Sequence, residues 1–400
     1  YYEIAIRFTH FDNFFITYKS IGYPILLGCW FLVFNSTSLF TAKLFNLFCY
    51  MLLLITAFLF CKDKNFSKIY KITFISLLAF CPLVLFYTNT LGCELISILL
   101  VMIMTFLYTH PSESNLKWIS LGIIIAILSL VKSYFMFFPF IIICIELLGK
   151  KIKFYKPVLM LITFFMVLSP FTYKTTQLTG TFSLVPSNGG IVLYRNNNDA
   201  NRNGIVQNYK IIIPPEGIID EMEAAGLHYE DEYKSAQKYY SKYGKDWILQ
   251  NVDKFIQLGF IRINKVLFDP SKLHYPLHMF QYNDYGEKTR ELTKNFIIHS
   301  TDAIMNIYSG CLVIFLFLAI IMIPGAILGK IQVDRMVYLI VFSSLFQFFV
   351  FFVAEGQARY FITLVVNAAY AVMVLLVITY DNFRRFTKKS ESFQTMQHLH

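Results

Sequence analysis

The sequence has few charged residues and no patterned cysteines, and these two absences remove most classes of soluble protein. Only 15% of the 400 residues are charged, whereas soluble domains carry nearer a quarter. With 56% hydrophobic residues and a mean hydropathy of +0.54, the chain is predicted to be an integral membrane protein. Its seven cysteines lie in or beside apolar segments without paired spacing, which favours small buried side chains over disulfides or a metal site.

Motifs for nucleotides, metals and nucleic acids are also missing. The segment SNGGIVLYRNNNDANRNG contains neither a helix-opening GxGxxG nor a GK[ST]. In LHYPLH, Pro276 separates His274 from His278 and spoils the helical spacing of a metal pair. The formal charge of +10 is not gathered into a basic stripe with stacking aromatics, so no nucleic-acid partner is predicted. No cofactor is predicted from these residues, and a divalent metal has no support in them.

Long apolar runs recur at close to the length of about 20 residues that a membrane-spanning helix needs. They lie at 42–61, 71–88, 91–109, 117–131, 134–148, 153–171, 303–328, 335–353 and 360–380. We therefore expect an all-α polytopic membrane protein with about nine spans, and a further span before residue 1. The apolar segment 21–35 is short and has an early proline, which favours an interfacial helix.

Under this count the basic residues of the short loops sort to one face, as the positive-inside rule requires. The opposite short loops hold only Lys132 and Arg359. The face expected to be cytoplasmic receives Lys62, Lys64, Lys68, Lys71, Lys117, Lys150, Lys151, Lys153, Lys156, Lys330, Arg335, Arg384, Arg385, Lys388 and Lys389.

The polar stretch between the two sets of spans is long enough for a small domain of its own. It opens with strand- and turn-like sequence, TFSLVPSNGGIVLYRNNN. Helical patterns follow in EGIIDEMEAAG, EDEYKSAQKYYSKYG and KDWILQNVDKFIQLGFIRINKVLF, which predicts an α+β or mostly helical domain. Five parts are expected. They are a first extracytoplasmic loop with an interfacial helix (1–41), transmembrane helices (42–172), an extracytoplasmic soluble domain (173–301), further transmembrane helices (302–381) and a cytoplasmic tail (382–400).

Several ionisable residues lie at the ends of spans on the predicted extracytoplasmic face. Charges inside or at the ends of spans are costly, so they are functional candidates: Lys19, Glu94, Lys132, Lys174 and Arg359. Cations there would stabilise a phosphate leaving group, and a carboxylate would act as a general base. The structural alternatives are lysines that extend to lipid headgroups and a simple i,i+4 pair of Glu355 with Arg359.

Five segments, in chain order, carry a resemblance to a known superfamily: GYPILLGCWFLVFN, YTNTLGCE, SLGIIIAILSLVKSY, PFTYKTTQLTGTFSLVPSNGGIVLYRNNN and AEGQARYFI. They resemble motifs of the polyprenyl-phosphate-sugar-dependent glycosyltransferases, in particular the dolichyl-phosphate-mannose-protein mannosyltransferases and the bacterial lipid A aminoarabinose transferases. The resemblance implies a C-type glycosyltransferase fold with its catalytic mouth on the extracytoplasmic face of a bacterial-type plasma membrane.

The resemblance also implies roles for individual residues. Glu94 would be the second acid of the site, and the main catalytic Asp would lie just before Tyr1, with Glu3 and Asp12 as weaker substitutes. The residues expected to contact the donor phosphate or to support the site are Lys19, Lys132, Lys174, Arg359, Glu355 and Tyr360. Lysine stands at 132 and 174 where relatives usually have arginine, which removes the bidentate fork.

These observations predict a membrane enzyme that moves a sugar from a polyprenyl-phosphate donor to a glycan, lipid or protein of the cell envelope, with inversion. An O-antigen polymerase or ligase is an alternative, but the arginines of the polar stretch are dispersed rather than paired. A flippase or transporter of lipid-linked sugars would show inverted repeats and charges near the middle of the membrane, and the sequence shows neither.

Overall fold

The computed structural model describes residues 1–12, 14–16, 19–149, 155–179, 182–186, 188–201, 204, 220–221, 223–224, 237–269, 272, 287–328 and 333–379. Within these ranges every regular element is a helix. Five helices are long and apolar enough to cross a membrane: Leu39–Asp63, Tyr155–Thr179, His299–Ala326, Arg335–Val353 and Ala358–Thr379. Shorter apolar helices lie beside them at Gly22–Phe34, Glu94–Thr109, Asn115–Val131 and Ser133–Leu148, so the chain is a multi-pass membrane protein.

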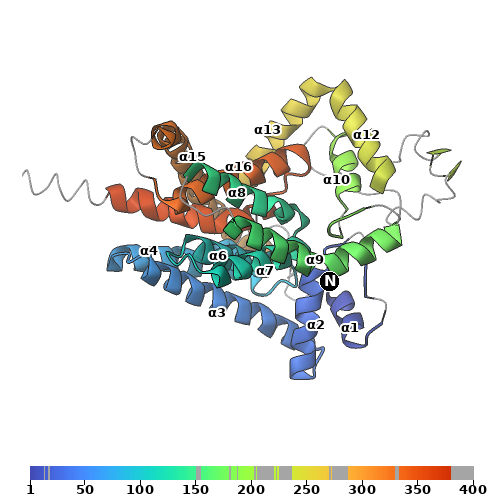
Figure 1. The fold of residues 1–400 in the computed structure, drawn as a ribbon, viewed down its shortest axis with the longest axis horizontal. Coiled ribbons are helices and arrows are strands. Elements are labelled where there is room, and N and C mark those ends of the chain that lie inside the picture. The colour runs from blue at the N-terminus through green and yellow to red at the C-terminus, as the bar shows by residue number, and fades with distance from the viewer. Residues whose placement is uncertain are drawn as a thin grey trace, which may run out of the picture.

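Three of the described helices begin at a side chain that caps them. Ser38, Ser114 and Asp334 accept hydrogen bonds from backbone amides at the starts of α3 (Leu39–Asp63), α7 (Asn115–Val131) and α16 (Arg335–Val353). Such caps satisfy amides that have no partner inside the helix. The helices α3, α7 and α16 pack around α6 (Glu94–Thr109) (Figure 1), and most side chains of α6 are buried.

The short helices at one end lie across the bundle. The helix α2 (Gly22–Phe34) lies at a steep angle to α3 and packs on α1 (Tyr2–Thr9) (Figure 1). A Cβ on Gly22 would come within 2.7 Å of the Leu130 carbonyl carbon, so glycine lets α2 approach the end of α7. The placement of this helix at the membrane interface stays a prediction.

Two predictions about secondary structure are wrong. The run at 71–88 is not one helix but α4 (Lys68–Ala79) and α5 (Pro82–Tyr87), because Pro82 drives the preceding Cys81 into an extended conformation. The strand-like segment at 181–198 contains the helix α10 (Gly189–Asn196). Packing of Tyr194 on Tyr240, with ring centroids 5.5 Å apart, outweighs the local β propensity.

Helical structure continues past both predicted edges of the polar stretch. The helix α9 (Tyr155–Thr179) runs beyond residue 173, and α15 (Glu287–Ile327) begins before residue 302. Between them, α12 (Gln237–Gln250) and α13 (Val252–Phe268) form a bent arm at the end of the bundle that holds α1 and α10 (Figure 1). The predicted helical segments EGIIDEMEAAG and EDEYKSAQ fall largely outside the described residues.

Close contact between α7 and α9 depends on Gly122. A Cβ there would lie 2.5 Å from the Met160 carbonyl oxygen, so Gly122→Ala is expected to force the two helices apart and destabilise the protein by about 1–3 kcal/mol. Gly310→Ala in α15 is the control, because nothing lies within 4 Å of its Cβ position. Thermal unfolding in detergent should show a lower Tm only for Gly122→Ala, and equal Tm values would contradict this packing.

Candidate functional site

Glu94 and Lys132 form a buried pair at the end of the bundle. Glu94 begins α6, Lys132 follows α7, and the Lys132 Nζ lies 4.0 Å from a Glu94 carboxylate oxygen. Their side chains are only 7% and 9% exposed. The start of a helix favours a carboxylate, and Gly92 leaves room for it because a Cβ there would collide with the Glu94 carboxylate.

The last apolar segment completes this site cluster, which we define as Glu94, Lys132, Glu355, Arg359 and Tyr360. Lys132 Nζ and the Arg359 guanidinium carbon each lie 5.4 Å from the centroid of the Tyr360 ring. The Tyr360 hydroxyl donates to Glu355 at 2.6 Å, and the Gln357 amide donates to the other Glu355 oxygen. Arg359 is also within electrostatic reach of Glu94 and Glu355. Two cations and two carboxylates therefore surround one aromatic ring.

Two tyrosines that the sequence did not point to lie against this cluster. The Cys93 sulfur, burial of the phenol end and the Glu94 charge raise the pKa of Tyr1 well above its usual value, while Arg359 opposes the shift. The Tyr1 ring packs edge-on to Tyr23, with centroids 5.7 Å apart. The Tyr23 hydroxyl is buried and has no hydrogen-bond partner among the described residues.

The other predicted site residues lie apart from this cluster. Glu3 is exposed on α1, and Lys19 is exposed near the backbone nitrogen of Tyr1. Lys174 is exposed on α9, next to a groove lined by Tyr173 and Phe182, and no described contact joins it to the cluster. The structure thus brings together Glu94, Lys132, Arg359, Glu355 and Tyr360 from the predicted set, and the roles of Lys19, Lys174 and Glu3 stay predictions.

Arg262 in α13 holds the turn at 353–357 that carries Glu355. Its side chain is fully buried and donates to the carbonyls of Phe352 at 2.7 Å and Val353 at 3.3 Å. It also donates to the Asn196 carbonyl and to the Asn197 side chain at 3.0 Å. Arg262 therefore joins three segments far apart in sequence, which is why spacing along the chain gave no sign of it.

Loss of Arg262 should loosen the site turn. Arg262→Met takes away the donor of the Phe352 carbonyl and of the Asn197 side-chain oxygen, each at about 1–3 kcal/mol, so the turn at 353–357 should exchange its amide hydrogens faster. Lys254→Met is the matched control on the same helix, because its bond to Asp199 joins two side chains more than half exposed. Hydrogen exchange measured by mass spectrometry checks this, and unchanged protection in Arg262→Met would contradict it.

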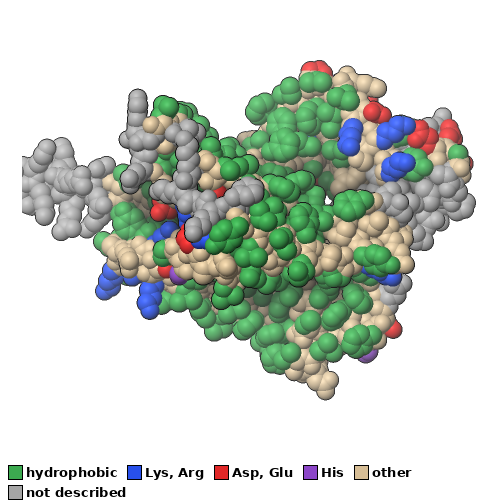
Figure 2. Space-filling model, in the orientation of Figure 1, with side chains coloured by type: hydrophobic (Ala, Val, Ile, Leu, Met, Phe, Trp, Pro, Cys, Tyr) green, Lys and Arg blue, Asp and Glu red, His purple; other side chains and the backbone are tan. Residues whose placement is uncertain are grey.

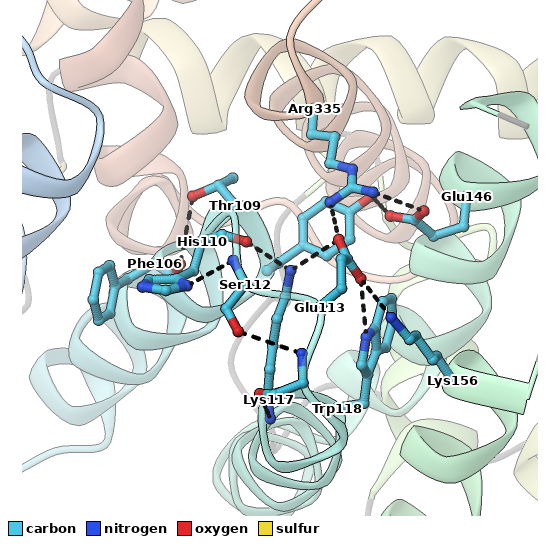
Figure 3. A network of polar contacts seen from close by, with 12 residues as sticks. Phe106, Thr109, His110, Ser112, Glu113, Lys117, Trp118, Glu146, Lys156 and Arg335 are labelled. Atoms are coloured by element: carbon cyan, nitrogen blue, oxygen red, sulfur yellow. Dashed lines mark hydrogen bonds and ion pairs between the residues drawn. The ribbon is translucent and has the colours of Figure 1, made fainter. Parts of the chain in front are cut away.

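A second charged network lies at the opposite end of the bundle (Figure 3). Its centre is Glu113, which accepts from Arg335 at 2.6 Å and from the Trp118 indole at 3.4 Å. Lys117 and Lys156 lie 3.6 and 3.5 Å from the same carboxylate. Glu146 lies 3.7 Å from Arg335 and accepts from the Tyr108 hydroxyl at 2.7 Å.

This Glu113 network joins loops that the charge pattern assigned to one face. Lys117, Lys156 and Arg335 come from three such loops, and Lys64 of a fourth lies 3.6 Å from Asp334 beside Arg335. Four of the loops predicted to share a face therefore meet at one end of the bundle, and their placement on the cytoplasmic side stays a prediction. Since the charges of the network neutralise one another, it suits a structural role, in which ion pairs hold the helix ends together, rather than a ligand site.

Protonation of Glu113 at low pH should break the ion pairs of this network. Burial alone would raise the pKa of Glu113, but the hydrogen bond from Arg335 and the charges of Lys117 and Lys156 lower it below its usual 4.5. Because its pKa is lowered in the folded protein, the ionised Glu113 carboxylate contributes its full stabilisation above pH 4.5. This stabilisation is lost as the pH falls through the folded-state pKa of Glu113. Glu113→Gln should therefore lower the Tm at pH 7, and the difference from wild type should shrink below pH 4.5.

The exposed Glu223→Gln serves as the control for thermal melts across this pH range. It should match wild type throughout. A Glu113→Gln deficit that stays constant into strong acid would show that shape, and not charge, is responsible.

Within the described ranges, no group of three His, Cys, Asp or Glu side chains could hold a metal ion. The site cluster itself offers carboxylates, cations and a phenol.

No protein-family model and no curated protein matches the chain. Among solved structures, it is similar to the apo oligosaccharyltransferase of Archaeoglobus fulgidus, with a TM-score of 0.51 and 10% identity over 98% of this chain and 47% of that one. The oligosaccharyltransferase AglB of the same organism, in complex with an inhibitory peptide and a dolichol-phosphate, gives a TM-score of 0.48, 11% identity and the same two coverages.

This chain thus spans about half the length of the proteins it matches. At such low identity the similarity bears on the fold alone. Together with the arrangement of apolar helices, it shows that the chain has the C-type glycosyltransferase fold.

Proposed function

We propose that this protein is a membrane glycosyltransferase that takes a sugar from a polyprenyl phosphate and passes it to a glycan, lipid or protein acceptor. The observation that carries the proposal is the site cluster itself, in which buried Glu94 and Lys132 meet the half-buried Arg359 at one end of the membrane helices. The C-type glycosyltransferase fold supports it, since the similar protein of A. fulgidus is an oligosaccharyltransferase.

In the proposed reaction, a carboxylate accepts the proton of the acceptor group while that group attacks the anomeric carbon. The bond from this carbon to the phosphate oxygen breaks with inversion, and the lipid phosphate leaves with the bonding electrons. Lys132 and Arg359 stabilise the negative charge that develops on the leaving phosphate. Glu94 is the carboxylate at hand, and Tyr23 offers its buried hydroxyl to the sugar or the phosphate.

Glu94, beside which the phenol of Tyr1 lies, is the carboxylate proposed to accept this proton. Glu355 has a different proposed role, since its oxygens accept from Tyr360 and Gln357 and so fix the ring against which both cations lie.

Both central residues should be needed for sugar transfer. Glu94→Gln removes the carboxylate without changing its size, and Lys132→Met removes the charge while keeping the chain length. We expect either change to lower transfer about 10²–10³-fold, the usual effect of losing one charge-stabilising or acid–base group. The assay uses protein in nanodiscs, a labelled polyprenyl-phosphate hexose and an envelope fraction that contains the acceptors, with loss of label from the lipid extract as the readout.

Lys242→Met is the control, because Lys242 is an exposed lysine of α12 that is 57% accessible and pairs with Glu221. It should transfer sugar at the wild-type rate. Normal turnover in both Glu94→Gln and Lys132→Met would refute the proposed site.

A further inference from the structure

The helix α13 presents three different faces. Its buried face holds Leu258, Arg262 and Val266 and packs against α16 and the 3₁₀ turn that carries Arg359. A polar face with Lys254, Gln257 and Asn264 is exposed. Between these two lies an exposed apolar face with residues four apart along the helix: Val252, Ile256 and Phe260, which are 51%, 44% and 65% accessible.

The apolar face continues onto surfaces at both of its ends. Leu249, in the last turn of α12, adds a side chain that is 75% exposed. At the other end, the Phe260 ring packs edge-on to Phe352 of α16, with centroids 5.7 Å apart. Along α16, Leu345 and Phe349 are 41% and 63% exposed on an apolar helix long enough to cross a membrane. One apolar stripe therefore leads from the membrane-spanning part of α16 to the tip of the arm.

The charged side chains of the arm lie away from its apolar stripe. Figure 2 shows hydrophobic side chains gathered over α13, and lysines with acidic residues over α12. On the polar side, Lys254 lies 3.0 Å from Asp199 and Lys242 lies 3.0 Å from Glu221. A helix with one face on protein, one apolar face exposed and one polar face exposed suits the boundary between lipid headgroups and acyl chains.

We propose that α13 lies in the surface of the leaflet at the site end of the bundle, with Leu249, Val252, Ile256 and Phe260 dipping among the lipids. The lipid is favoured over a protein partner because the stripe is continuous with the lipid-facing surface of α16. Arg262, on the buried face of the same helix, holds the turn that carries Glu355. The bilayer thus supports the site turn through α13, and this inference does not depend on the reaction proposed above.

Photo-crosslinking in native membranes tests this placement. A genetically encoded p-benzoylphenylalanine replaces Ile256, Lys254 or Phe349 in three separate variants, all at exposed positions that tolerate the ring. Illumination should give phospholipid adducts at Ile256 and at Phe349, detected by mass spectrometry of the purified chain. The variant at Lys254, on the polar face, should give at least ten times fewer.

The other outcomes each overturn the proposal in a recognisable way. A dimer band from Ile256 without lipid adducts would make the stripe an interface between two copies of the chain. Adducts at Phe349 and none at Ile256 would place the arm in water. Adducts at neither position would contradict the membrane-spanning assignment of α16 as well.

Discussion

The buried pair of Glu94 and Lys132 is the constraint on which the rest of the site depends. A single charge buried at the end of a helix bundle costs several kcal/mol, and a partner at 4.0 Å compensates for it only in part. Neither side chain can be fixed without the other, so the pair ties the start of α6 to the end of α7. It leaves cationic and anionic surface directed toward Tyr360 and Arg359, which gives this end of the bundle its chemistry.

The two ends of the bundle use similar residues for different purposes. At the Glu113 network, three cations lie between 2.6 and 3.7 Å from two carboxylates, and a tyrosine hydroxyl and an indole donate to the same groups. At the site cluster, the pair is longer and a tyrosine hydroxyl nearby has no partner among the described residues. A site that binds a transient ligand needs groups that remain unsatisfied without it, whereas a fastening of helix ends does not. Arg262 has a third kind of role, because its hydrogen bonds only position the turn that carries Glu355.

Sequence reasoning located the site cluster because charge in an apolar segment is conspicuous and costly. Glu94, Lys132 and Arg359 were found in this way, and the order of loops predicted their common face. Arg262 was missed because its partners are backbone carbonyls of Phe352, Val353 and Asn196, which leave no mark in the sequence. Tyr1 and Tyr23 were missed because tyrosine is common in such a chain. The helix at 189–196 and the break at Pro82 show that packing and a single proline override a hydrophobicity pattern over a short distance.

The central claim is that the site cluster recognises the phosphate of a lipid-linked sugar, and equilibrium binding tests it most directly. Native mass spectrometry of the purified chain, titrated with a polyprenyl phosphate and with the matching polyprenol, separates recognition of the phosphate from recognition of the prenyl chain. We predict that the phosphate form binds at least tenfold more tightly, and that Lys132→Met removes most of this preference. Equal binding of the two lipids, or an unchanged preference in Lys132→Met, would contradict the account.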